Sequence, residues 1–175
     1  MSSRTEIAFA ADSDTTGVDS NFDVYVVPVE GGKARNLTPD NPAGDGSPAY
    51  SPDGRFIAFG RQVVKGFYAD RTRLVLHDRA ASTNRVLSEA WDRSVGALSW
   101  APDSKTLLGA IDDAGHGRVY SIDAATGAPQ PLTKALTYSG LALSRDGKTL
   151  MALREGFSEP PTLVRVDLAS GEATK

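Results

Sequence analysis

The stretch SPDGRFIAF, residues 51–59, joins a tight-turn signal to a short apolar run. Nearly the same pattern returns as APDSKTLLGAI from Ala101 and as SRDGKTLMAL from Ser144. The three copies begin 50 and 43 residues apart. Periods of this size are typical of arrays of small structural units, so the repeat decides how the rest of the chain is interpreted.

Each copy predicts a hairpin followed by an apolar strand. In the first two copies Pro at the second turn position presets φ, Asp suits the next position in all three, and Gly accepts the left-handed conformation that closes the turn. In the second copy Ser104 stands where the others have Gly, at a cost on the order of 1 kcal/mol. A basic residue follows every turn: Arg55, Lys105 and Lys148.

The remainder of each unit is also repeated. An apolar third strand ends at an acidic residue before a turn, in DVYVVPVEGG (23–32), RLVLHDRAAS (73–82), RVYSIDAATG (118–127) and TLVRVDLASG (162–171). A short fourth strand follows in ARNLT (34–38), NRVLS (84–88) and PQPLT (129–133), with Leu37, Leu87 and Leu132 at equivalent points. Four short antiparallel strands in about 40–50 residues are typical of a β-propeller blade.

We therefore predict an all-β fold, a partial β-propeller of about four four-stranded antiparallel blades. The repeat units span about 1–47, 48–96, 97–139 and 140–175. EIAFAADSD (6–14) aligns with RFIAFGRQV (55–63), which places residue 1 at a second strand and leaves the first blade without its inner strand.

Two other architectures share some of these features. A β-sandwich also has strands every 8–12 residues, but the recurrence of the turn at one point of each unit argues against it. A closed ring of four blades is conceivable, whereas the missing strand favours a piece of a larger ring.

Composition excludes several functions. Hydrophobic residues are 40% and charged residues 23% of the 175, which suits a folded soluble protein. The net charge of −3 gives no reason to expect nucleic acid. No apolar run approaches the ~18–20 residues of a membrane span. The chain has no cysteine, and no cofactor is predicted. Both a cytoplasmic and a periplasmic location stay open.

Two segments carry a family resemblance. WDRSVGALSWAPDSKTLLGAIDDAGHGRVYSIDAATG (91–127) and GFYADRTRLVLHDRAA (66–81) resemble the propeller of the prolyl oligopeptidase family of serine peptidases. The branch they resemble is that of the acylaminoacyl peptidases and dipeptidyl peptidase V. The Pro-Asp-Gly repeat by itself is shared with TolB-like propellers. The resemblance implies a propeller that caps an α/β-hydrolase domain and limits the size of its substrates.

The sequence has no G-x-S-x-G, the turn that carries the nucleophile of α/β-hydrolases. The resemblance therefore implies a non-catalytic part that gates and orients peptide substrates. Its partners would be the hydrolase domain and the remaining blades of the parent chain. Open sheet edges also predict self-association. The alternative, from another functional class, is a TolB-like protein-binding propeller with no peptidase link.

The long loops are where binding residues are expected. In such a blade the connections between strands two and three, and those between units, emerge on one face. The candidates on that face that would contact substrate or another domain are Arg61, Tyr68, Asp70, Arg71, Trp91, Asp92 and Arg93. Arg can bind a carboxylate bidentately, and Trp or Tyr can stack on a peptide. Alternatively, Asp70, Arg71, Asp92 and Arg93 are structural ion pairs between neighbouring blades.

One loop has calcium-like spacing. In DSDTTGVDSNFD (12–23), Asp12, Asp14 and Asp23 fall at positions 1, 3 and 12 of an EF-hand loop. The flanks are typical of strands, and the last position holds Asp instead of the longer Glu. A polar loop without metal is therefore the competing interpretation. His116 lies near Asp112 and Asp113, but nothing in the sequence supplies the further ligand that a metal site needs, so a solvated loop histidine is expected. His77 lies on a predicted third strand.

Overall fold

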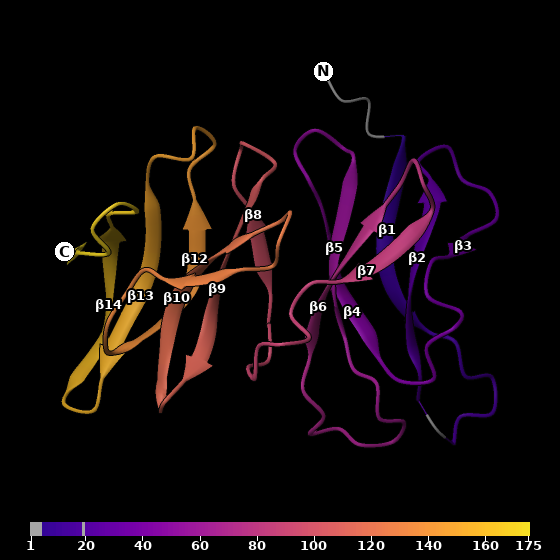
Figure 1. The fold of residues 1–175 in the computed structure, drawn as a ribbon, viewed down its shortest axis with the longest axis horizontal. Helices are drawn as coiled ribbons and strands as arrows, with labels where there is room; N and C mark the ends of the chain where they lie inside the picture. The colour runs from indigo at the N-terminus through magenta and orange to yellow at the C-terminus, as the bar shows by residue number, and fades with distance from the viewer. Residues whose placement is uncertain (1–4, 19) are drawn as a thin grey trace. The chain divides into compact units, whose positions relative to one another are not determined.

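A computed structural model describes residues 5–18 and 20–175, and this described part forms four antiparallel sheets without a helix (Figure 1). It accordingly contains no helix that could span a membrane. The chain divides into two compact units, Met1–Val95 and Gly96–Lys175. Each unit holds two of the sheets, so the fold is all-β, as predicted.

The first unit contains a three-stranded sheet, β1-β2-β3, and a four-stranded sheet, β4-β5-β6-β7. The strands are β1 (Glu6–Asp12), β2 (Phe22–Pro28), β3 (Arg35–Asn36), β4 (Asp45–Tyr50), β5 (Phe56–Arg61), β6 (Arg73–Asp78) and β7 (Thr83–Val86). Consecutive strands are neighbours, which is the meander expected of a blade. The first sheet has three strands where the second has four, in agreement with the predicted absence of an inner strand.

The second unit contains two four-stranded sheets with the same consecutive order. Their strands are β8 (Leu98–Trp100), β9 (Thr106–Asp113), β10 (His116–Asp123), β11 (Pro129–Pro131), β12 (Thr137–Leu143), β13 (Leu150–Gly156), β14 (Glu159–Val166) and β15 (Ala173–Thr174). Every pairing is antiparallel. The same short meander is thus built four times in the described chain, once without its first strand.

The repeated turns close as their sequences predict. The amide of the fourth turn residue donates to the carbonyl three residues earlier, at 2.9 Å for Gly54, 3.1 Å for Ser104 and 2.8 Å for Gly147. Their φ angles are 73°, 56° and 71°, so Ser104 does adopt the left-handed conformation. Hydrogen bonds from the Ser51 hydroxyl and the Arg55 amide hold the pKa of the Asp53 carboxyl below its usual value. That carboxylate is therefore an ionised acceptor at neutral pH.

The short fourth strands are joined to the third strands in one repeated way. The amides of Leu37, Leu87 and Leu132 each donate at 2.8 Å to a third-strand carbonyl. The accepting residues are Val24, Leu74 and Val119. This confirms that the three leucines are equivalent, and it fixes an offset of 50 residues between the first and second sheets.

The residue after each leucine completes the same motif. The hydroxyls of Thr38, Ser88 and Thr133 accept from the amides of those same third-strand residues, at 3.0, 2.8 and 3.0 Å. The three hydroxyl residues are almost fully buried. A Leu-Thr or Leu-Ser dipeptide therefore satisfies both backbone groups of one third-strand residue in three of the four sheets. Sequence analysis did not assign this role, although the dipeptide recurs at a fixed place in the repeat.

The offset of 50 residues also corrects the alignment of the first strand. Glu6 pairs with Pro28, and Phe56 pairs with Asp78, so Glu6 is equivalent to Phe56. The predicted alignment, which matched Glu6 with Arg55, is wrong by one residue. The Ile-Ala-Phe sequence that β1 and β5 share marks the correct register, because a one-residue slip moves every side chain to the other face of the sheet.

Each unit has an apolar cluster formed by two sheets. In the first unit Val24 and Val26 of β2 pack with Ile57 and Phe59 of β5, and all four are buried. The cluster of the second unit contains Val119, Tyr138, Leu150, Ala152, Val164 and Val166. Full burial of an aliphatic or aromatic side chain contributes about 1.5–3 kcal/mol. The main stabilisation of each sheet therefore comes from the sheet packed against it.

We predict that Thr133→Val destabilises the chain by about 1–3 kcal/mol, because it leaves the buried amide of Val119 without its acceptor. Denaturant-induced unfolding measures the change. The matched control is Thr174→Val on the exposed side of β15, which should alter stability by no more than about 0.5 kcal/mol. Equal unfolding midpoints for the two variants would contradict the role assigned to the hydroxyl.

Candidate functional site

The connecting loops of the first unit meet at one edge of its two sheets. The amide of Gln62 donates to the carbonyl of Gly44 at 2.8 Å, and the amide of Thr72 donates to the Ser94 hydroxyl at 3.1 Å. The Asn21 side chain lies 3.4 Å from the carbonyl of Asn41. These contacts join the segments 13–18 with 20–21, 39–44, 62–72 and 87–95, which we call the loop edge. Figure 1 shows the β1–β2 and β5–β6 loops on the lower side of this unit.

The interior of the loop edge is a buried ion pair. Arg61, at the end of β5, donates from Nε to Asp45 Oδ1 at 2.7 Å, and its side chain is only 10% exposed. The Asn41 amide donates to Asp45 Oδ2 at 3.1 Å and to the Gln62 carbonyl at 2.9 Å. Burial raises the pKa of Asp45, while Arg61 and Asn41 oppose that rise. The structure therefore uses Arg61 to tie β4, β5 and the 39–44 link together.

Asp70 closes the base of the β5–β6 loop. Its carboxylate accepts from the amides of Val63 at 2.6 Å and Val64 at 3.0 Å. Arg73 Nη1 lies 3.3 Å from the same carboxylate. Burial raises the pKa of Asp70, but the two amides and Arg73 outweigh it and hold the pKa below its usual value. Gln62 adds side-chain hydrogen bonds to the carbonyls of Tyr68 and Asp70, at 3.1 and 2.9 Å.

Arg71 connects the same loop to the 87–95 link. Its guanidinium donates to the carbonyls of Ser88 at 3.2 Å and Glu89 at 3.1 Å, and also to that of Trp91. The Glu89 carboxylate lies 3.3 Å from Arg71 and 3.1 Å from Arg73 Nε. The loop and the link are thus held together by a charged network on one sheet.

This network differs from the ion pairs considered in the sequence. Asp70 pairs with Arg73 and Arg71 pairs with Glu89, so the expectation that Asp70 and Arg71 pair with Asp92 or Arg93 between blades is wrong. The adjacent side chains of Asp92 and Arg93 approach each other at 4.0 Å.

Sequence analysis missed Arg73 and Glu89. Their proximity follows from strand register, because β6 pairs with β7 through Val75 and Val86. Arg73 at the start of β6 therefore lies across from the residues that follow β7, where Glu89 stands. The opposite charges at the start of the third strand and after the fourth strand were the sequence signal that could have predicted this ion pair.

The β5–β6 loop, whose base this network closes, carries a group of exposed apolar side chains. Val63, Val64, Phe67 and Tyr68 are 43%, 49%, 51% and 93% exposed, and we call them the aromatic tip. The two rings lie 6.4 Å apart between centroids, tilted by 58°. An apolar group displayed on a loop with a fixed base is a feature of contact surfaces. Of the other candidates, Trp91 is half-buried, the Asp92 side chain is fully exposed and that of Arg93 is 38% exposed.

The carboxylates of the calcium-like loop accept hydrogen bonds from nearby hydroxyl, amide and side-chain donors of the protein. Asp12 accepts from the Ser20 hydroxyl at 2.5 Å and from the amides of Asp14 and Asn21, which hold its pKa below the usual value. Asp14 accepts from Thr16, and the buried Asp23 accepts from Asn36 at 2.6 Å. Within residues 5–18 and 20–175 no three His, Cys, Asp or Glu side chains are grouped to hold a metal. Calcium binding by this loop stays a prediction of the spacing alone.

Among curated proteins, the chain is similar to dipeptidyl-peptidase 5 of Porphyromonas gingivalis. The two are 27% identical over 157 residues, which cover 89% of this chain and 23% of that protein. It is also similar to dipeptidyl-peptidase 5 of Aspergillus oryzae, at 37% identity over 103 residues, which cover 58% of this chain and 14% of that protein. The chain thus spans less than a quarter of the length of these relatives. No family model matches it.

Solved structures show the same fold. A crystal structure of puromycin hydrolase matches 97% of this chain and 28% of its own, with a TM-score of 0.77 and 22% identity. A putative TolB from Agrobacterium tumefaciens matches 97% of this chain and 60% of its own, with a TM-score of 0.74 and 15% identity. The β-propeller domain of a trilobed protease from Pyrococcus furiosus matches 98% of this chain and 49% of its own, with a TM-score of 0.69 and 17% identity.

These comparisons confirm two predictions. The structural matches confirm the partial β-propeller. The curated relatives confirm the resemblance to the propeller portion of a prolyl oligopeptidase-family peptidase, which residues 66–81 and 91–127 indicated.

Proposed function

We propose that this peptidase-associated propeller is a non-catalytic part that gates and orients peptide substrates for an α/β-hydrolase domain. The observation that carries the proposal is the exposed aromatic tip on the loop edge, whose loop is closed at its base by Asp70 and Arg73. The similarity to dipeptidyl-peptidase 5 supplies the class of substrate, a peptide. The chain spans only part of those relatives, so the hydrolase domain belongs to the proposal as well.

The geometry of the tip suits a peptide or domain contact. Phe67 and Tyr68 present apolar ring faces, and the Tyr68 hydroxyl can accept or donate a hydrogen bond. Their loop is closed by Asp70 and Gln62 before any ligand arrives. A loop that is already ordered loses less conformational entropy on binding, which favours affinity and a defined orientation. Arg93 lies on the same edge, where its side chain is 38% exposed and its guanidinium donates to the carbonyl of Asp92.

The roles of the other charged candidates are architectural in this proposal. Arg61 and Arg71 direct their guanidinium groups to Asp45 and to loop carbonyls, and both side chains are less than one-fifth exposed. The catalytic serine, acid and histidine would come from the hydrolase domain, since this sequence has no G-x-S-x-G.

The second candidate function is a TolB-like propeller that binds a protein and has no peptidase partner. It is favoured by the TolB structure, whose TM-score of 0.74 is close to the 0.77 of puromycin hydrolase. A G-x-S-x-G on a strand-turn-helix in the same polypeptide distinguishes the two. Peptidase assays of residues 1–175 alone are expected to be blank under either function.

The exposed sheet faces support further partners, either remaining blades of a parent chain or a second copy. In the first unit Ile7 is 53% exposed and lies on the face of β1 and β2 opposite the core, with the stacked Phe9 and Tyr25. In the second unit Leu153 and Leu163 pair across β13 and β14 and are 42% and 59% exposed. Apolar sheet faces of this kind are typical of surfaces that another sheet covers.

We predict that residues 1–175 self-associate in the absence of the rest of a parent protein, because these faces are apolar. Light scattering over a range of concentrations measures the molar mass. Replacing Leu153 and Leu163 with Thr should lower the association, whereas Val29→Thr on an exposed turn of the first unit should not. A folded monomer at every concentration would contradict the prediction.

We predict that Phe67→Ala with Tyr68→Ala in the full-length protein lowers kcat/KM for a peptide substrate about tenfold, equivalent to about 1.4 kcal/mol. The melting temperature should not change, because both side chains are exposed. Asp70→Asn should lower kcat/KM in the same direction by loosening the base of the tip. Val29→Ala is the exposed apolar control. Unchanged turnover in the double variant would refute the role of the tip.

A further inference from the structure

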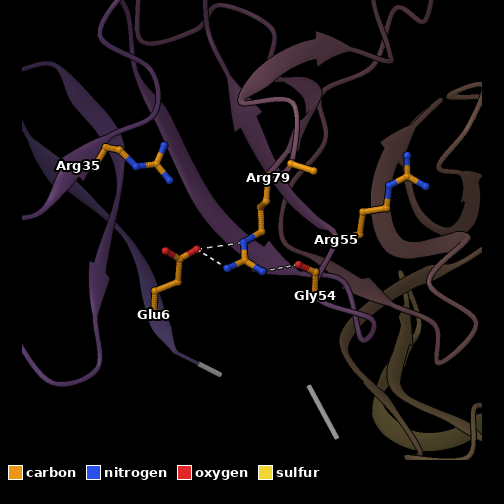
Figure 2. Close-up of a pocket in the computed structure, with 6 residues that line it drawn as sticks. Glu6, Arg35, Gly54, Arg55 and Arg79 are labelled. Atoms are coloured by element: carbon orange, nitrogen blue, oxygen red, sulfur yellow. Dashed lines mark hydrogen bonds and ion pairs between the residues drawn. The ribbon is translucent and has the colours of Figure 1, made fainter. Parts of the chain in front are cut away.

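A cavity of about 420 Å³ lies at the edge of the first unit where the Pro-Asp-Gly turn is located, away from the loop edge. It is lined by Glu6, Arg35, Gly54, Arg55, Arg79 and Ala80 (Figure 2). Three arginines and one glutamate thus line this cavity, although the chain as a whole carries a net charge of −3. The cations come from β3, from the turn after β4 and from the end of β6, which are far apart in sequence.

Arg79 is fixed in the centre of this cavity. Its Nε and Nη2 donate to Glu6 Oε1 at 3.0 and 2.6 Å, and its Nη1 donates to the carbonyl of Gly54. The guanidinium carbon also lies 5.2 Å from the centre of the Tyr50 ring. Figure 2 shows Arg79 between Glu6 and Gly54. The side chain therefore supplies a positive charge in a defined place, and each of its three nitrogens already donates one hydrogen bond.

Arg35 and Arg55 have donors available. In residues 5–18 and 20–175 no hydrogen bond or ion pair holds the exposed Arg35 side chain, and Figure 2 shows its guanidinium directed toward the side of Glu6 and Arg79. Arg55 is 64% exposed and lies 3.5 Å from Asp78 Oδ2. The other oxygen of Asp78 accepts from the amides of Ala80 and Ala81.

The charges of this cavity are not balanced by its own carboxylates. With Asp78 included, three arginines face two acidic side chains, which leaves an excess of one positive charge. Clustered cations repel one another, and an anion between them removes that repulsion. Guanidinium groups present paired N–H donors that match the oxygens of phosphate, and each charge-assisted bond is stronger than a neutral one.

We propose that this cavity binds a phosphate group, free or as a small phosphate ester. Arg35 and Arg55 donate to the phosphate oxygens, and Arg79 contributes its fixed charge. Arg55 is turned outward in Figure 2 and reaches the group by rotation of its exposed side chain. The site lies outside the loop edge and does not depend on the proposed peptidase role.

The repeat supplies an internal control for this site. Lys105 follows the second turn as Arg55 follows the first, and its carbonyl accepts from Ala124 just as that of Arg55 accepts from Arg79. Ala124 has no charge, so the arginine cluster is not reproduced beside Lys105. Lys105→Gln therefore removes a positive charge from the equivalent turn without touching the cavity.

The experiment titrates inorganic phosphate into residues 1–175 at constant ionic strength and follows the amide resonances of Gly54 and Ala80. We expect saturable shifts confined to the cavity, at least tenfold weaker binding in Arg35→Gln with Arg55→Gln, and unchanged binding in Lys105→Gln. A parallel titration with glycerol 3-phosphate distinguishes an ester from the free ion, and saturable binding of either one supports the site.

Three results would overturn the proposal. Shifts that do not saturate would indicate only general screening of charge. Equal binding by the double variant would place the phosphate elsewhere. Equal binding of acetate at the same ionic strength would show that the cavity does not select the phosphate group. Arg35 and Arg55 are both exposed, so the variants are expected to fold and each result is interpretable.

Discussion

The constraint behind this structure is that a sheet of three or four short strands cannot bury an apolar face by itself. A small sheet gains stability only when a second layer covers an apolar face. In the first unit, Val24 and Val26 meet Ile57 and Phe59 from the next sheet. The second unit repeats the arrangement around Val119, Leu150 and Val164. Stability is therefore shared between neighbouring sheets, as in other repeat proteins.

Because neighbouring sheets pack through their faces, the turns and loops at the ends of the strands are not needed for the apolar core. In three of the sheets the turn between the first and second strands is short, and its aspartate accepts from an amide of the turn itself. At the loop edge of the first unit, longer segments are ordered by charge, through Asp45 with Arg61 and Asp70 with Arg73. A buried ion pair adds little net stability but does fix geometry, since a misplaced partner leaves a desolvated charge. This division explains how an exposed aromatic tip can stand on a rigid base.

The parts of the fold that were predictable from sequence depend on local chemistry. Turn residues and alternating apolar residues act within a few positions, so Gly54, Ser104 and Gly147 indicated the hairpins and hence the repeated sheets. The register of β1 was misplaced by one residue because no turn precedes it in the described chain. The buried hydroxyls after the equivalent leucines were visible as a repeated dipeptide, but their burial depends on the finished sheet.

The candidate sites were less predictable because their partners are distant in sequence. Exposure of Tyr68 on a long loop was anticipated, whereas the contact of Arg71 with Glu89 required the pairing of β6 with β7. The contact of Glu6 with Arg79 spans 73 residues and two sheets. No local pattern indicates a pair of this kind, so the arginine cavity became evident only from the structure.

The most direct test of the shared core is to compare unfolding of residues 45–95, which hold one complete sheet, with unfolding of residues 1–95, which hold two. Circular dichroism through a thermal ramp measures both. We expect a cooperative transition for 1–95 and none for 45–95, because the latter lacks the β2 side of its apolar cluster. A cooperative transition at the same temperature in both fragments would contradict it.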